Sequence, residues 1–235
     1  MKTNFQKILA RSKIIAASVP NFFYFKKLSK KKDNDNLNLL KENGFIILKN
    51  VISENKCENI SKLIDEFISE KKIIFIEKQK IWKISHADNF IDYIENIMNF
   101  NNLSNLISDY FRREFFLSDF DIRRVEPADY KEISRNGKSN SDWHKDIRGK
   151  QLKLMIYITD VSKKDNHFSL IPNSHYKKIY NFDESRFDEN DINFNDQIKI
   201  LGKKGTAVLF DTNIIHRLNR VPNSKMRDSI TLNFT

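Results

Sequence analysis

Residues 205–234 read GTAVLFDTNIIHRLNRVPNSKMRDSITLNF, and the pattern of this stretch decides the fold. It contains two short runs with strand character, Ala207–Phe210 and Ser229–Phe234, with turn residues between them. Further runs of the same kind are Phe115–Val125, Lys153–Thr159, Phe168–Ile171 and Ile198–Ile200. The second half of the chain is therefore predicted to consist of many short β-strands.

The first half of the chain has a helical pattern. Residues 37–52 predict a short helix that ends at Gly44, followed by a strand. Ser53 is the expected N-cap of a second helix, residues 72–86 predict a pair of strands, and residues 89–111 predict one or two helices. Early helices and late strands favour a mainly β fold of the α+β class, an antiparallel sandwich or barrel with a helical layer on one side.

The charge of the chain is concentrated at its N-terminus. The 235 residues carry a net charge of +10, and residues 1–32 hold nine basic residues and no acidic one. We therefore divide the chain into a basic N-terminal extension, residues 1–32, and one nearly neutral domain, residues 33–235. A neutral domain argues against nucleic-acid binding. The extension has three interpretations: packing on the domain, contact with an anionic membrane or a partner, and nucleic-acid contact or targeting.

Composition excludes several other classes of protein. No run of 18 apolar residues exists, so no transmembrane helix is expected. The apolar segment at residues 14–19 is too short for a secretion signal, so we expect a cytoplasmic protein, with membrane association through the extension as the alternative. The single cysteine, Cys57, rules out an internal disulfide and is expected to be a core residue.

A set of metal-ligating residue types stands out in the second half. His144 and Asp146 are two residues apart, and on a strand such residues point the same way and can share one metal ion. The best candidate for a second histidine ligand is His216, which directly follows a strand-like run. Two histidines and one carboxylate leave three adjacent positions open on an octahedral Fe(II) ion.

A cationic side chain follows the second candidate histidine ligand in the sequence. Arg227 lies eleven residues after His216, and Ser229 shares its face of the last predicted strand. An arginine fork binds a carboxylate through two hydrogen bonds. A metal face with a nearby arginine therefore suits 2-oxoglutarate, with one end of this cosubstrate on iron and the other on Arg227.

From about residue 37 to the C-terminus, the chain resembles the phytanoyl-CoA dioxygenase-like family of Fe(II)/2-oxoglutarate oxygenases. The matching segments are ENGFIILKNVIS, WHKD, LKLMIYITDVSKKDNHFSLIPNSH, GTAVLFDTNIIHR and NSKMRDSITLNF. The resemblance implies a double-stranded β-helix, the cupin-like jelly roll, with the N-terminal helices packed on one sheet. It also implies that His144, Asp146 and His216 bind Fe(II), that Arg227 binds 2-oxoglutarate, and that O2 is consumed.

The chain departs from the family pattern at two places. It has Asn166-His167 where the family has Asn-Gly, and Asn173 where the family has glycine in Pro-Gly-Ser-His. Because asparagine tolerates a left-handed backbone, the second turn is expected to persist. Relatives that halogenate lack the carboxylate ligand, so Asp146 favours hydroxylation or another oxidation.

The prime substrate, meaning the molecule oxidised together with the cosubstrate, is expected to be a small organic or lipid- or sugar-linked compound. Candidate pocket residues, each with an alternative structural or surface role, are Trp82, His86, Arg123, Trp143, His167 and His175. Two other functions stay open: a non-catalytic jelly roll that binds a ligand or partner, and an oxygenase that acts on a macromolecule.

Overall fold

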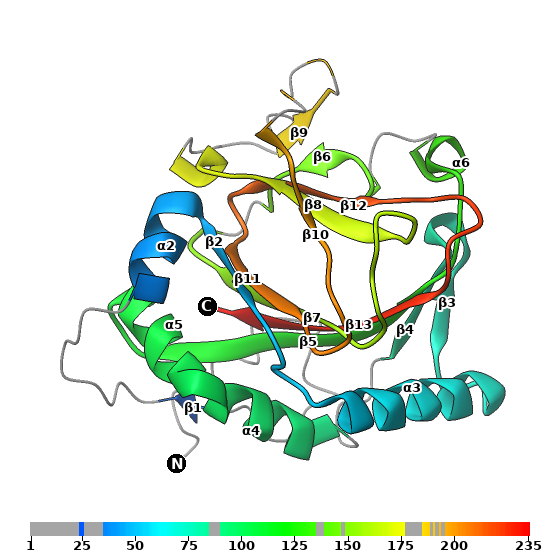
Figure 1. Cartoon of the computed structure of the whole chain (residues 1–235), viewed down its shortest axis with the longest axis horizontal. Helices are drawn as coiled ribbons and strands as arrows, with labels where there is room; N and C mark the ends of the chain where they lie inside the picture. Colours follow the sequence, from blue (N-terminus) through cyan, green and yellow to red (C-terminus); the bar gives the residue numbers. More distant parts are fainter. Residues whose placement is uncertain are drawn as a thin grey trace, which may run out of the picture.

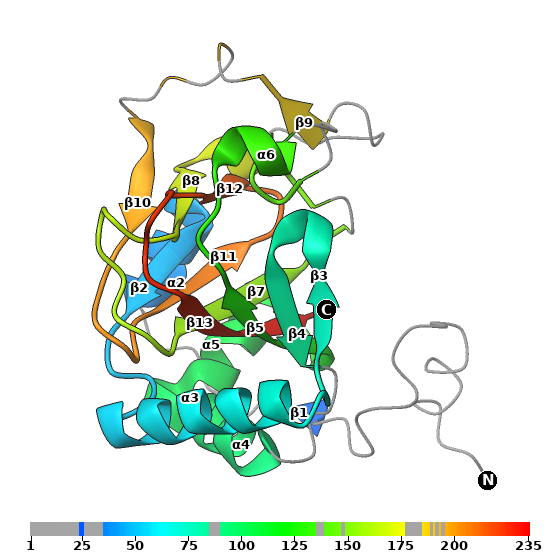
Figure 2. The same cartoon turned by 90° about the vertical axis from the view of Figure 1, so that its right-hand side faces the viewer.

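A computed structural model describes residues 24–25, 35–84, 90–134, 139–146, 149–176, 185–188, 190, 193 and 196–235. Two antiparallel sheets lie face to face, and helices cover the outer face of the larger sheet (Figures 1 and 2). This arrangement confirms the predicted mainly β fold with a helical layer on one side.

In the part of the chain that the structure describes, the larger sheet has eight strands. Its order is β2 (Phe45–Leu48), β11 (Ala207–Asp211), β7 (Leu152–Tyr157), β13 (Arg227–Phe234), β5 (Phe115–Val125), β4 (Ile81–Ile84) and β3 (Ile74–Ile76), and β1 (Tyr24–Phe25) also pairs with β5. The smaller sheet has the order β10 (Ile198–Ile200), β8 (His167–Ile171), β12 (Ile215–Asn219), β6 (Trp143–His144) and β9 (Arg186–Phe187). From β5 to β8 and from β10 to β13 the chain crosses repeatedly between the sheets, as in a jelly roll.

Five α-helices are described, and four of them form the outer layer. They are α2 (Asp35–Asn43), α3 (Glu54–Ser69), α4 (Ile91–Asn99) and α5 (Leu103–Phe111), while α6 (Tyr130–Ser134) lies in the β5–β6 connection. Gly44 ends α2 with φ +83°, as predicted. Ser53 is the N-cap of α3, as predicted, but its side chain makes no capping hydrogen bond.

Strand β13 shows why the two faces of the larger sheet differ. Its residues Ile230, Leu232 and Phe234 are fully buried in the core beneath the helices. The alternating residues, Ser229 and Thr231 among them, line a cavity between the sheets. The period of two along a strand thus separates the apolar core from the cavity wall.

The sequence-based boundaries hold for most elements. β13 begins at Arg227, the residue expected to open the last strand, while β7 ends two residues earlier than predicted. The strand assumed at His144 and Asp146 covers only Trp143–His144, and β12 was not among the predicted strand runs. Cys57 is fully buried, as expected of a core residue. Apart from β1, the basic extension lies outside the described residues. None of the described helices is long and apolar enough to span a bilayer.

Candidate functional site

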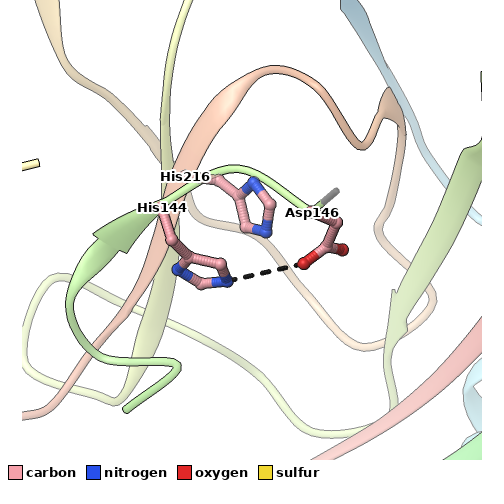
Figure 3. A group of neighbouring side chains, drawn as sticks. All are labelled: His144, Asp146 and His216. Atoms are coloured by element: carbon pink, nitrogen blue, oxygen red, sulfur yellow. Dashed lines mark ion pairs between the residues drawn. The ribbon is translucent and has the colours of Figure 1, made fainter. Parts of the chain in front are cut away.

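The predicted metal-ligating residues come together on the inner face of the smaller sheet. One ligand atom each of His144, Asp146 and His216 lies within 4.8 Å of the others (Figure 3). His216 on β12 pairs directly with His144 on β6, which places the imidazole centroids 4.3 Å apart. Asp146 lies just beyond β6, where its N–H donates to Thr212 O at 2.9 Å. The three side chains therefore form one face.

Backbone carbonyls hold both imidazoles in one orientation. Nδ1 of His144 lies 2.7 Å from Asp142 O, and Nδ1 of His216 lies 2.8 Å from Ile214 O. Each Nδ1–H donates to its carbonyl oxygen, so the lone pair of each Nε2 is left for a metal ion. A backbone carbonyl that fixes the tautomer in this way is a common outer partner of a metal-binding histidine.

The protonation states also suit a metal ion. Burial lowers the pKa of His216 to about 3 and lowers the pKa of His144. Burial opposes ionisation of Asp146, but the ammonium group of Lys153 holds the pKa of this carboxyl below its usual range. Metal ligands must be neutral imidazoles and ionised carboxylates, and the three side chains have these states near neutral pH.

Lys153 on β7 orients the carboxylate ligand. Its Nζ lies 2.6 Å from Oδ2 of Asp146, while Oδ1 of Asp146 lies 3.8 Å from Nε2 of His144. One carboxylate oxygen is thus held by the ammonium group, and the other faces the histidines. This geometry favours a single oxygen ligand from Asp146.

The triad opens into a cavity of about 240 Å³ between the two sheets. Its lining residues are Ile81, Asp119, Asp121, Arg123, Val125, Asn140, His144, Asp146, Gln151, Lys153, Met155, Phe168, Phe210, His216, Leu218, Arg227, Ser229, Thr231 and Asn233. The histidines stand on the smaller sheet, and Arg227 and Ser229 on the larger one. A ligand in this cavity can contact both groups.

Arg227 and Ser229 present buried donors that have no partner in the described part of the chain. The two residues are 4% and 1% exposed, and Nε and Nη1 of Arg227 and Oγ of Ser229 make no hydrogen bond. Burial lowers the pKa of Arg227, and its guanidinium carbon lies 5.7 Å from the centroid of the Tyr157 ring. Buried donors without partners are costly, so this pair fits an anionic ligand such as a carboxylate.

Of the five candidate substrate residues that the structure describes, only Arg123 lines the cavity. Strand alternation turns Trp82, Trp143 and His167 away from this cavity. The residues next to them in sequence, Ile81, His144 and Phe168, take the inward positions. Trp82 instead stacks on a neighbouring ring and donates from Nε1 to Glu126, and Trp143 packs under the guanidinium of Arg217. His86 lies outside the described residues.

His175 also lies away from the cavity lining and anchors its loop. Its Nε2 is 3.0 Å from Lys41 O, and a Cβ on Gly44 would lie 2.5 Å from its Nδ1. The preceding Asn173 has φ +62°, which confirms that asparagine keeps the left-handed turn. At the other departure from the family pattern, His167 takes a strand conformation in β8.

Several cavity residues were missed by sequence reasoning. They are the polar residues Asp119, Asp121, Asn140, Gln151, Lys153, Thr231 and Asn233. The sequence did contain a signal for polar cavity residues in the last strand. There the polar residues Ser229, Thr231 and Asn233 alternate with apolar ones, as in a strand with one polar face. Lys153 gave no signal, because its contact with Asp146 depends on how β7 faces the smaller sheet.

Residues 40–229 match the Phytanoyl-CoA dioxygenase (PhyH) family, which is most of the chain. Together with the jelly roll and the grouped ligand residues, this match shows the class of protein. The chain belongs to the phytanoyl-CoA dioxygenase family. No protein with curated information matches it in sequence.

Solved structures share the fold at low sequence identity. The epimerase SnoN, in complex with Fe3+, alpha ketoglutarate and nogalamycin RO, has a TM-score of 0.65 and 10% identity, with 86% of this chain and 82% of SnoN covered. HygX from Streptomyces hygroscopicus, with nickel and 2-oxoglutarate bound, has a TM-score of 0.63 and 13% identity, with 87% of each chain covered. EctD from S. alaskensis, in its apoform, has a TM-score of 0.64 and 15% identity, with 92% of this chain and 84% of EctD covered.

Proposed function

We propose that this protein is an Fe(II)- and 2-oxoglutarate-dependent oxygenase that hydroxylates a C–H bond of a small molecule and releases succinate and CO2. One observation carries the proposal: the His144, Asp146 and His216 face shares its cavity with the buried, unpartnered donors of Arg227 and Ser229. Membership of the phytanoyl-CoA dioxygenase family and the 2-oxoglutarate-bound relatives SnoN and HygX support it.

The residues of the site divide into metal ligands and cosubstrate ligands. His144, His216 and one oxygen of Asp146 would hold Fe(II), and Lys153 keeps the second oxygen of Asp146 turned away from the histidines. Arg227 and Ser229 would hold the far carboxylate of 2-oxoglutarate. When bound, Fe(II) with 2-oxoglutarate and O2 supplies the oxidant for C–H bonds. The chain supplies orientation and exclusion of water, since the two histidines and Arg227 are at least nine-tenths buried.

The test is an anaerobic titration of the Fe(II)-loaded protein with 2-oxoglutarate, followed by the visible metal-to-ligand charge-transfer band. We expect the band in the wild type and a loss of cosubstrate affinity of at least about tenfold in Arg227→Ala, because a charge-assisted pair is removed. Arg113→Ala, at an exposed position, is the matched control and should behave as the wild type.

The same preparations separate the alternatives. Succinate formation coupled to loss of 2-oxoglutarate in the presence of O2 identifies an enzyme. A protein that binds iron without giving the band does not use 2-oxoglutarate, and one that binds no iron is a non-catalytic jelly roll. Either of these last two results would contradict the proposal.

A further inference from the structure

A row of polar side chains runs along the cavity on the larger sheet. We call it the polar wall and define it as Asp119, Asp121 and Arg123 on β5 with Thr231 and Asn233 on β13. All five line the cavity, and the strand register sets Asp119 opposite Asn233 and Asp121 opposite Thr231. Burying polar groups without partners is costly, so a cavity wall of this composition favours a polar ligand.

The two carboxylates of the polar wall differ in their partners. Asp121 is neutralised, with Lys83 Nζ 2.6 Å from its Oδ1 and Arg123 Nη2 2.5 Å from its Oδ2. Within the described part of the chain, Asp119 has no ion-pair partner. Its Oδ1 accepts the N–H of Phe120 at 2.9 Å, and its Oδ2 has only a long contact of 3.4 Å with Asn233 Nδ2. Asp119 therefore keeps capacity to accept a hydrogen bond.

The position of Asp119 separates it from the proposed cosubstrate site. Arg227 pairs with Val125 on β5, six residues from Asp119, which is about 20 Å along the strand. On the other side, Asn233 pairs with both Asp119 and Lys153, and Lys153 contacts the carboxylate of Asp146. Asp119 thus belongs to the cross-strand row that ends at the metal face, away from Arg227.

We infer that the Asp119 end of the polar wall binds the prime substrate and that Asp119 accepts a hydrogen bond from a hydroxyl or ammonium group of that substrate. The substrate class is a small polar molecule rich in hydrogen-bond donors. A fatty acyl chain along this wall would desolvate Asp119 without giving it a partner, which disfavours such a substrate. This inference rests on the proposed function and adds to it the class of molecule that is oxidised.

The test measures binding of three small probes to protein loaded with Zn(II) and 2-oxoglutarate, by saturation-transfer NMR. Glycerol and 2-aminopropane-1,3-diol differ only in a hydroxyl or ammonium group, and pentan-1-ol supplies an apolar chain. The variants are Asp119→Leu and Asp119→Asn, with the exposed Asp160→Asn as the matched control. Binding of 2-oxoglutarate by each variant shows that the fold and the proposed cosubstrate site are intact.

We expect the wild type to bind the two polar probes more tightly than pentan-1-ol. Asp119→Leu should weaken the polar probes about tenfold and strengthen pentan-1-ol, because an acceptor is replaced by an apolar group. In Asp119→Asn, a larger loss for 2-aminopropane-1,3-diol than for glycerol would identify an ammonium group as the natural donor, and equal losses would identify a hydroxyl.

Three results would overturn the inference while leaving the proposed function standing. The first is tight binding of pentan-1-ol to the wild type, and the second is unchanged binding of the polar probes to Asp119→Leu. The third is no binding of either polar probe to wild-type protein that does bind 2-oxoglutarate. Failure to bind 2-oxoglutarate at all would instead count against the proposed function.

Discussion

At the scale of single residues, Gly205 shows how backbone geometry fixes the turn before β11. It has φ +85°, its N–H donates to Tyr157 O at 2.7 Å, and its carbonyl accepts the N–H of Val51 at 2.9 Å. A Cβ at this position would lie 2.2 Å from Ile52 O. Gly149 also has a positive φ, +74°, but a Cβ there would meet no atom within 4 Å.

We therefore expect Gly205→Ala to lower the free energy of unfolding by clearly more than Gly149→Ala. Both variants bear the strain of a left-handed alanine, about 1 to 2 kcal/mol. Only Gly205→Ala adds a steric clash, because its Cβ would collide with the backbone carbonyl of Ile52. Urea unfolding of the metal-free proteins measures the difference. Equal losses in the two variants would show that the turn adjusts without strain.

The scale of single residues is also where sequence reasoning about the site was strongest. His144, Asp146 and His216 were chosen from residue type and spacing, and the structure groups them within 4.8 Å. The structure places Trp82 and Trp143 outside the cavity lining, because the inward face of a short strand depends on its partners. A shift of one residue exchanges the two faces, and nothing in a two-residue strand such as β6 fixes the choice in advance.

At the scale of elements, a polar network fastens α3 to the larger sheet. Arg124 on β5 donates from Nε and Nη2 to the two carboxylate oxygens of Asp228 on β13, at 2.7 and 2.8 Å. From α3, Ser61 Oγ donates to Oδ2 of Asp228 at 2.8 Å, and Asp65 pairs with Arg124. Asp228 is 1% exposed, so these partners replace the hydrogen bonds that its side chain would make to water.

Asp228→Ala should reduce the free energy of unfolding by about 3 kcal/mol, because it removes the buried member of the ion pair and leaves Arg124 with only the exposed Asp65 as an acidic partner. Asp160→Ala removes an exposed pair with Lys203 and is the matched control, for which little change is expected. Chemical denaturation followed by circular dichroism measures both. A loss for Asp228→Ala no larger than that of the control would mean that apolar packing alone holds α3.

At the scale of the whole molecule, buried neutral histidines make stability depend on pH. Burial lowers the pKa of His167 below its ordinary value of 6.5, and it lowers those of His144 and His216 as well. The unfolded chain therefore binds protons at a higher pH than the folded chain does. It follows that stability is fully present above about pH 6.5 and falls as the pH drops below this value.

We expect the metal-free protein to lose free energy of unfolding between about pH 7 and about pH 5, and His167→Gln to lose less over the same interval. The comparison is between the two pH values within each protein, so any fixed cost of the substitution cancels. The exposed Lys203→Gln should follow the wild type. An unchanged pH dependence in His167→Gln would show that His167 titrates alike in the folded and unfolded chains.

Residue type, period and spacing along the chain predicted most of the helices and strands in their order. They also pointed to the candidate metal ligands His144, Asp146 and His216 and to Arg227, because such patterns can be read locally. Only the tertiary structure decided which strands face each other, and this placed Lys153 against Asp146 and Asp119 on the cavity wall. Lys153 on β7 and Asp119 on β5 are brought together by β13, which pairs with both strands, and β7 and β13 pair across more than 70 residues of chain. Register and sheet packing, which no local pattern encodes, therefore shaped the cavity and the polarity of its walls.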